Sequence, residues 1–270
     1  MQEVTQETTQ KTILITGATD GIGLLTARKL LDAGHHILLH GRNQAKLAHA
    51  ASQLGDAPTY QADFSRMDEV TAMATTILAE HKKLDVLINN AGILKSPDTQ
   101  TVAGRDIRFD VNTLAPFILT KMLLPILPKD GRVVNLSSAA QAPVDPAAMM
   151  NFQPMDDMAA YAQSKLAITI WTAELARKMP TGPVFVSVNP GSLLASKMVK
   201  EGFGIEGNDL NIGADILQKA ALSDDFATAT GAYFDNDRGT FSNPHHAADD
   251  PDHVKAVMRV LDALASPIVG

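Results

Sequence analysis

The chain contains no cysteine, so the sequence excludes a disulfide framework and any metal site built on thiolates. It also lacks the His-Glu-x-x-His helix pattern of zinc hydrolases and the Gly-x-Ser-x-Gly turn of serine hydrolases. We therefore expect no metal ion in the protein. A chain without cysteine fits a reducing compartment, and we predict a cytoplasmic location.

Basic clusters and long apolar runs are also missing. Lys and Arg total 23 against 30 acidic residues, and the net charge of −7 argues against a nucleic-acid partner. No run of about 18 apolar residues predicts a membrane span. The opening MQEVTQETTQ has no apolar core of a secretory signal, so we expect residues 1–10 to form a flexible tail. The remaining residues 11–270 are expected to form a single domain.

Short apolar runs alternate with helix-length segments along the chain. Strands that are apolar throughout are typical of a parallel sheet covered on both faces. The pattern predicts an α/β fold, a three-layer doubly wound parallel sheet of about seven strands with helices on both faces. The predicted strands lie in residues 11–17, 35–43, 58–65, 84–92, 132–138, 184–191 and 231–235, and the clearest helices in residues 21–34, 44–54, 67–81 and 158–179.

A glycine-rich turn, TGATDGIG at residues 16–23, joins the first predicted strand to the first predicted helix. Glycine permits tight backbone geometry and close approach of a ligand. The free N–H groups and positive dipole end of the following helix suit a pyrophosphate. The strand before and the helix after the turn favour a dinucleotide site over a plain connection.

The end of the second predicted strand carries Arg42 and Asn43 and no acidic residue. In dinucleotide folds an acid at this point binds the ribose 2′-hydroxyl, whereas an arginine accommodates a 2′-phosphate. Arg42 could instead be a solvated residue at a helix start. The arrangement predicts NADP(H) as the cofactor, with NAD(H) as the alternative.

The sequence YAQSK places Tyr161 four residues before Lys165 in a predicted helix, so both side chains project from one face. A nearby cation lowers the pKa of a tyrosine from its ordinary value of about 10, which suits a residue that exchanges a proton near neutral pH. The alternative is an ordinary pair on a helix surface.

Together these motifs resemble the short-chain dehydrogenase/reductase family over nearly the whole chain, and the long segment before YAQSK is similar to its retinol-dehydrogenase-like branch. The resemblance implies a Rossmann fold. It also implies a catalytic set and a cofactor-binding set. The catalytic set is Asn112 in FDVNTLAPF, Ser138 rather than Ser137 in NLSS, Tyr161 and Lys165. The cofactor-binding set is Gly17, Thr19, Asp20, Gly21, Ile22, Gly23, Arg42, Asn43, Asp63, Phe64, Asn90, Ala91, Gly92, Tyr161, Lys165, Pro190 and Gly191.

The resemblance implies an NADP(H)-dependent oxidoreductase that transfers a hydride between nicotinamide and a carbonyl or alcohol substrate, a small molecule. Tyr161 would be the general acid/base, Ser138 would hold the carbonyl oxygen, and Asn112 would hold a water next to Lys165. One alternative is a non-catalytic, nucleotide-sensing regulatory protein, although such relatives typically lose the tyrosine or the lysine. Another is an isomerase, epimerase or dehydratase of the wider superfamily.

Two long segments, residues 141–158 and 192–210, follow predicted strands and are expected to be substrate loops. Several methionines in the first, and Phe203 in the second, are candidates to cover a ligand. The segments APFILTKMLLPIL and LAITIWTAEL are apolar on more than one side, so they must be buried by their own domain or by a partner. Since the corresponding helices of the family often pack against a second subunit, we expect a homodimer or homotetramer.

Overall fold

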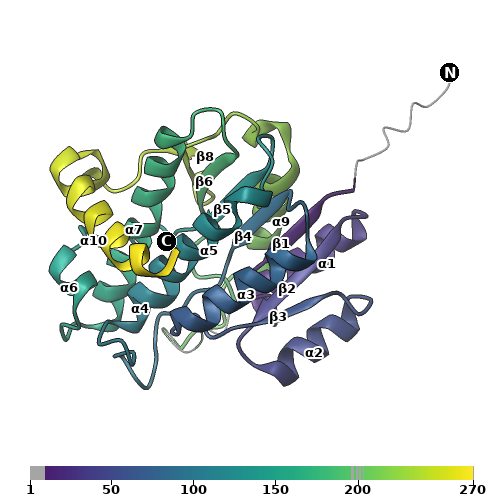
Figure 1. Ribbon diagram of the computed structural model, residues 1–270, viewed down its shortest axis with the longest axis horizontal. Coiled ribbons are helices and arrows are strands. Elements are labelled where there is room, and N and C mark those ends of the chain that lie inside the picture. Colours follow the sequence, from purple (N-terminus) through teal and green to yellow (C-terminus); the bar gives the residue numbers. More distant parts are fainter. Residues whose placement is uncertain (1–9, 196–197, 199, 201, 203, 270) are drawn as a thin grey trace.

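The computed structural model describes residues 10–195, 198, 200, 202 and 204–269, and a single sheet runs through the centre of the protein (Figure 1). The strand order is β3-β2-β1-β4-β5-β6-β7-β8; β1 to β7 are parallel, and β8 pairs antiparallel with β7. This confirms the predicted doubly wound parallel sheet and adds one strand beyond residues 231–235. The strands are β1 Thr12–Ile15, β2 His36–Gly41, β3 Thr59–Gln61, β4 Val86–Asn89, β5 Arg132–Leu136, β6 Val184–Asn189, β7 Tyr233–Asp235 and β8 Thr240–Ser242.

The strand order reverses beside β1. From β1 the chain moves outward to β2 and β3, then returns to place β4 on the opposite side of β1. The connections after β1 and β4 therefore leave the sheet in different directions, and a crevice opens between them at the carboxyl edge. In open parallel sheets ligands bind at such a point.

Alternating side chains of the buried strands supply two hydrophobic cores. Ile13 and Ile15 of β1 face one core, and Leu14 between them faces the other. The first core is covered by α1 Gly21–Asp32, α2 Gln44–Gln53 and α9 Leu210–Leu222. The second is covered by α3 Met67–Glu80, α4 Ile107–Phe109, α5 Ala115–Leu123 and α7 Asp157–Lys178.

The C-terminal helix α10 Pro251–Val269 adds a further layer over the second core. It packs against α5, α7 and the short helix α6 Pro146–Met150, and it lies on their outer side in Figure 1. Val257, Leu261 and Ala265 of α10 are fully buried there. The apolar outer sides of α5 and α7 are thus covered within the same chain.

The helical stretch Ile107–Ile126 is the one segment, among the described residues, with the length and hydropathy of a membrane-spanning helix. It comprises α4, a π-helical turn Asp110–Leu114, α5 and a 3-10 turn Leu124–Ile126. Its mean hydropathy is 1.2, and 72% of it is buried inside the protein. The core of the domain accounts for its apolar character. Two further 3-10 turns, Asp224–Phe226 and His246–Asp249, complete the fold.

A buried ion pair anchors the start of α7, the helix that carries Tyr161. The Arg108 side chain is fully buried and its guanidinium contacts the carboxylates of Asp106 at 2.6 Å and Asp157 at 2.5 Å. Asp157 is the first residue of α7, so the pairs tie this helix end to α4. A buried charge is costly unless it is paired, so each partner depends on the others.

We expect Arg108→Met to lower the free energy of unfolding by about 3–5 kcal/mol, because it leaves Asp106 buried without its cation. Urea denaturation measures the change. The double variant Arg108→Met with Asp106→Asn removes both charges and should recover part of the loss. The control Lys219→Ala breaks an exposed pair with Asp225 and should leave the midpoint nearly unchanged. A midpoint for Arg108→Met equal to that of the control would contradict the anchoring role.

Candidate active site

The glycine turn between β1 and α1 brings backbone atoms closer together than side chains would allow. Gly17 has a φ of +64°, and a Cβ on it would lie 2.9 Å from the Ala91 Cα atom. A Cβ on Gly23 would lie 2.4 Å from the Gly17 carbonyl oxygen. The α1 helix begins at Gly21, and no side chain caps its first N–H groups. The turn therefore offers unblocked donors to a phosphate group.

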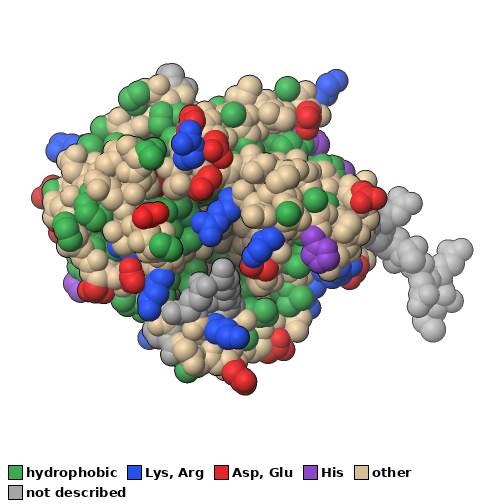
Figure 2. All heavy atoms as spheres, turned by 90° about the horizontal axis from the view of Figure 1, so that it is seen from below, with side chains coloured by type: hydrophobic (Ala, Val, Ile, Leu, Met, Phe, Trp, Pro, Cys, Tyr) green, Lys and Arg blue, Asp and Glu red, His purple; other side chains and the backbone are tan. Residues whose placement is uncertain are grey.

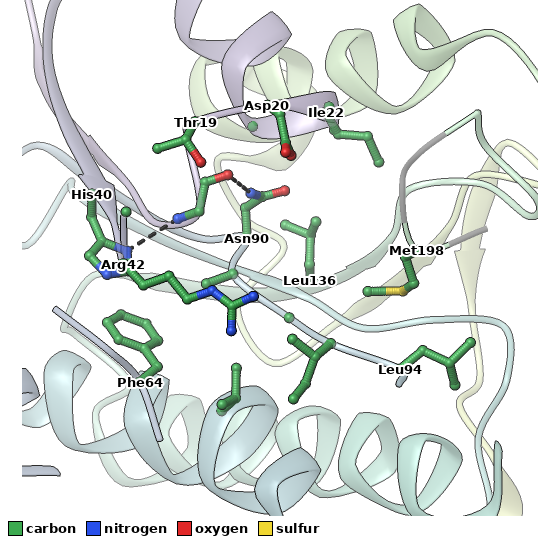
Figure 3. A pocket seen from close by; sticks show the side chains of 18 of the residues that line it. Thr19, Asp20, Ile22, His40, Arg42, Phe64, Asn90, Leu94, Leu136 and Met198 are labelled. Atoms are coloured by element: carbon green, nitrogen blue, oxygen red, sulfur yellow. Dashed lines mark hydrogen bonds between the residues drawn. The ribbon is translucent and has the colours of Figure 1, made fainter. Parts of the chain in front are cut away.

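The end of β4 supports this turn. The Asn90 side-chain amide donates to the carbonyls of Thr16 at 2.8 Å and Gly17 at 3.0 Å. The Ala91 N–H donates to the Thr16 hydroxyl at 3.0 Å. Figure 3 shows Asn90 directly beneath the turn that carries Thr19 and Asp20. The sequence NNAG at residues 89–92 thus holds the crevice between β1 and β4 in a fixed shape.

His40 of β2 is part of the site although the sequence analysis does not single it out. Its Nδ1 atom accepts the Gly17 N–H at 3.2 Å, and its Nε2 atom lies 3.0 Å from the Ala62 carbonyl oxygen. Burial lowers the pKa of His40 to about 4, so the ring is neutral at pH 7, with Nε2 as the donor. The ring also stacks on Phe64, with the ring centroids 4.2 Å apart. His40 therefore links the glycine turn to the segment after β3.

The adenosine end of the predicted cofactor site contains Arg42, Asn43, Asp63 and Phe64. Arg42 is exposed, and Figure 3 shows its guanidinium reaching across the pocket. The Asn43 side chain instead caps α2 by accepting the Lys46 N–H at 3.0 Å. Asp63 accepts hydrogen bonds from the N–H and hydroxyl of Ser65. Lys46 also lines the pocket and adds a second cation beside Arg42.

Tyr161 and Lys165 also line this pocket, whereas Ser138 does not. The Ser138 side chain lies next to the Tyr161 phenol and acts on its pKa. The Lys165 ammonium lies 5.5 Å from the centroid of the Tyr161 ring and donates to the Leu136 carbonyl at 2.8 Å. The Ser137 hydroxyl, by contrast, is buried against α7, 2.7 Å from the Thr169 hydroxyl.

Burial controls the protonation of this group. The pKa of Tyr161 is raised above its ordinary value because burial disfavours the phenolate, and the hydrogen bond with Ser138 opposes this shift. The sequence analysis expects a lowered pKa from the neighbouring lysine. The structure gives the opposite direction because desolvation is the larger effect. Burial also lowers the pKa of Lys165 to about 8.

Asn112 lies in the π-helical turn Asp110–Leu114, and its side chain bonds both the segment after β4 and α7. Its amide nitrogen donates to the Ile93 carbonyl and the Ser164 hydroxyl, both at 2.9 Å, and its oxygen accepts the Ile93 N–H at 2.8 Å. The side chain thus pins the segment after β4, and its oxygen can accept one further hydrogen bond. A Cβ on Gly92 would lie 3.3 Å from the Asn112 oxygen and 3.4 Å from the Lys165 nitrogen.

The turn after β6 is held from two sides. Pro190 lines the pocket, whereas Gly191 does not. The Asn189 side chain donates to Asp235 at 2.9 Å and to Asp237 at 2.8 Å. Asp237 also accepts the Ser192 N–H at 2.8 Å. These contacts fix the start of the segment 192–210.

The pocket that joins these groups has a volume of about 440 Å³. Figure 2 shows the molecule from below the view of Figure 1, with a hollow near the middle of this face and Lys and Arg side chains at its rim. The predicted cofactor-binding residues line the pocket, apart from Gly191. Lining residues that the sequence analysis does not name as site residues are His40, Gly41, Lys46, Ala62, Ile93, Leu94, Lys95, Val111, Leu136, Ser137 and Met198.

The two predicted substrate loops differ in their relation to the pocket. Met149 of the first is 1% exposed and belongs to the hydrophobic core under α10. Met198 of the second lines the pocket, and a Cβ on Gly202 would lie 2.7 Å from the Leu94 side chain. Phe203 lies outside the described residues. No metal-ligating cluster of His, Asp or Glu occurs in the described part of the chain.

Over most of its length the chain matches a known protein family. The model of the family described as short chain dehydrogenase matches residues 11–203. Retinol dehydrogenase 12 of Mus musculus is 34% identical over 248 residues, covering 83% of this chain and 77% of the relative. Retinol dehydrogenase 13 of Homo sapiens is 31% identical over 257 residues, covering 83% and 76%. A crystallised short chain dehydrogenase from Shigella flexneri, complexed with NADP, has a TM-score of 0.67 at 28% identity, covering 84% and 97%.

The buried Lys165 predicts a specific pH dependence of stability. Its pKa is lowered from 10.5 to about 8 in the folded state, so between these values only the unfolded chain holds the proton. The free energy of unfolding then rises with pH across this window, while below about pH 8 the full cost of burying the charge remains. Wild type should gain up to about 3 kcal/mol relative to Lys165→Met across this window.

Urea denaturation of both proteins at several pH values measures this difference. Lys219→Met, which removes an exposed lysine, serves as the control and should track wild type at every pH. Parallel stability curves for wild type and Lys165→Met would show that Lys165 titrates normally.

Proposed function

The chain belongs to the short-chain dehydrogenase family, in its retinol-dehydrogenase-like branch, and we propose that it is an NADP(H)-dependent oxidoreductase that interconverts a carbonyl and an alcohol. One observation carries the proposal. Tyr161 and Lys165 lie together in a pocket that also contains the glycine turn and Arg42, and the Ser138 side chain lies next to the Tyr161 phenol. A substrate oxygen placed between the two hydroxyls would accept a hydrogen bond from Ser138 and a proton from Tyr161.

The pocket has the features that a nicotinamide dinucleotide needs. Close backbone approach at Gly17 and Gly23 leaves no room for a Cβ, and the uncapped start of α1 suits the pyrophosphate. When bound, the cofactor supplies or accepts the hydride. The protein has to orient the substrate, stabilise charge on its oxygen and move one proton.

Tyr161 is the proposed proton donor in reduction. Because burial raises its pKa, the phenol is protonated at neutral pH and can give its proton to the developing alkoxide. Ser138 donates a hydrogen bond to the same oxygen and stabilises its negative charge. Lys165, with a pKa of about 8, then stabilises the phenolate and can return a proton to it. The protonated resting state favours reduction over oxidation at neutral pH.

The preference for NADP(H) over NAD(H) is proposed from charge. Arg42 and Lys46 line the pocket at the end of β2, where no acidic residue follows the strand. Two cations attract a 2′-phosphate, and an acid in that place would repel it. The relative from Shigella flexneri, which is complexed with NADP, supports this choice.

The substrate is proposed to be a small carbonyl or alcohol compound with an apolar part. Ile93, Leu94 and Met198 form the apolar lining, and a methionine adapts to irregular apolar shapes. Residues 192–210 would flank the opening, since Met198 of this segment lines the pocket. Residues 141–158 also follow a strand at the carboxyl edge, but Met149 of that segment packs in the core under α10. The relatives named retinol dehydrogenase make an apolar substrate a natural first choice.

The homodimer or homotetramer and the cytoplasmic location both stay predictions. The apolar segments that suggest a second subunit from the sequence lie in α5 and α7. Helix α10 covers much of their surface within the chain.

The decisive assay follows NADPH absorbance with a panel of ketones, aldehydes and quinones that includes retinal. Turnover with at least one class supports the proposal. A chain that binds NADPH and turns over none of them would support the regulatory alternative.

Tyr161→Phe should reduce kcat by about 10²- to 10⁴-fold while NADPH binding stays close to wild type, because the change removes the proton and keeps the ring. Tyr60→Phe is the matched control, since Tyr60 bonds Glu80 and His81 away from the pocket. Equal turnover of a folded Tyr161→Phe and wild type would exclude Tyr161 as the proton donor.

Arg42→Ala should weaken NADPH binding about tenfold or more and leave NADH binding nearly unchanged, because charge-assisted hydrogen bonds to a phosphate are lost. Arg28→Ala, which removes an exposed arginine of α1, is the control. Titration of both cofactors by fluorescence measures the preference. Equal affinities of the wild type for NADPH and NADH would contradict it.

A further inference from the structure

The peptide carbonyl of Ser138 receives hydrogen bonds from two side chains, one distant in the chain and one three residues away. The Tyr233 hydroxyl, at the start of β7, donates to it at 3.1 Å. The Gln141 amide nitrogen donates to it at 2.9 Å. Ser138 follows β5 and lies in no strand or helix, so these two bonds replace the regular pairing that would otherwise orient its peptide group.

Gln141 connects this carbonyl to the C-terminal part of the chain. Its amide nitrogen also lies 3.3 Å from the Ser137 hydroxyl, and its amide oxygen accepts the His245 N–H at 2.8 Å. The His245 N–H needs an acceptor and the Ser138 carbonyl needs a donor. Only one of the two flipped orientations of the Gln141 amide provides both. A second bond of the same kind joins the Val144 N–H to the His253 ring at 3.3 Å.

Tyr233 is suited to be a permanent donor. It is 6% exposed, and burial together with the nearby Asp235 and Asp237 raises the pKa of its phenol well above the ordinary value. The phenol therefore keeps its proton over the whole range in which the protein would work. Its ring is fixed by the sheet, since Tyr233 pairs with Ser187 of β6 and Ser242 of β8.

The Ser138 hydroxyl depends on the orientation of its own peptide. Its oxygen accepts the Ala140 N–H at 3.1 Å, which leaves its hydrogen free to be donated. The same hydroxyl lies next to the Tyr161 phenol and lowers its pKa. If the 138–139 peptide rotated, both contacts would change together, and the hydroxyl would leave the place where a substrate oxygen meets Tyr161.

We propose that Gln141 and Tyr233 are positioning residues for Ser138, and that the C-terminal segment completes the active site through the bond between His245 and Gln141. The inference rests on the proposed function, since it assigns a role within the same site. Neither side chain touches the substrate in this scheme; each acts through the Ser138 peptide.

A double-mutant cycle tests this role. Gln141→Met and Tyr233→Phe should each lower kcat about tenfold, with the Kd for NADPH unchanged, because the Ser138 hydroxyl is misplaced. In a Ser138→Ala background the same substitutions should lower kcat no further, since the group that they position is gone. An equal fold-reduction in both backgrounds would overturn the proposal, because it is the result of general damage to the fold.

Two further variants separate the contacts of Gln141. Gln141→Glu keeps an acceptor for the His245 N–H and replaces the donor to Ser138 with an oxygen, so kcat should fall as in Gln141→Met. Wild-type kcat in Gln141→Glu would overturn the role of this donor. Gln163→Met is the matched control, since Gln163 accepts the Asp145 N–H at 2.8 Å, away from Ser138, and its kcat should stay within about twofold of wild type.

A crystal structure of Gln141→Met gives a readout that does not need turnover. We expect the Ser138 peptide carbonyl and hydroxyl to leave their wild-type positions beside Tyr161; a Ser138 that keeps its wild-type position would overturn the proposal. If the wild type reduces no carbonyl compound, the proposed function fails, and the crystal structure still decides whether Gln141 orients Ser138.

Discussion

Two hydrogen bonds from the Asn90 amide to the carbonyls of Thr16 and Gly17 hold the carboxyl ends of β4 and β1 side by side. The rest of the site depends on this junction. Parallel pairing sets the heights of the neighbouring strands, with Ile15 opposite Ile88 and Asn89 opposite Asn135. The segments after β1, β4, β5 and β6 therefore leave the sheet at one edge and line one pocket. Hydrogen bonds between neighbouring strand ends, such as the one from the Gly17 N–H to the His40 ring, hold these ends together.

Burial, more than pairing of charges, sets the protonation of the groups around the pocket. It keeps His40 neutral with a pKa of about 4, raises the pKa of Tyr161 and lowers that of Lys165 to about 8. Each shift favours the uncharged form, as expected where water is scarce. The pocket thus presents a protonated phenol and an amine that is partly neutral near pH 8. A charged substrate or cofactor group bound beside Tyr161 or Lys165 would shift the pKa values of these residues again, because it would favour the form of each residue that carries the opposite charge.

The sheet, the glycine turn and the tyrosine–lysine pair could be predicted because each follows from local sequence. Apolar runs mark β1 and β4, and the spacing of Tyr161 and Lys165 places them on one side of α7. The sign of the Tyr161 pKa shift could not be predicted, since it depends on burial, a property of the assembled fold. The same holds for Met149, whose segment looks like a lid but packs under α10. His40 and Tyr233 could not be predicted because their partners Ala62 and Ser138 lie 22 and 95 residues away in the chain, and Gln141 could not because its link to His245 spans 104 residues.

Helix α10 and the turn before it are the last described parts of the chain, yet they close the second core and reach Gln141 through the His245 N–H. A ribosome makes proteins from the N-terminus onward, so the cofactor turn and YAQSK emerge well before residue 245. Until that residue has left the exit tunnel, α5 and α7 have no cover and the Ser138 peptide lacks one of its supports. Under the proposed function, the order of synthesis would separate two abilities in time: the segments that line the cofactor pocket emerge first, and the bond between His245 and Gln141 forms only after residue 245 has emerged.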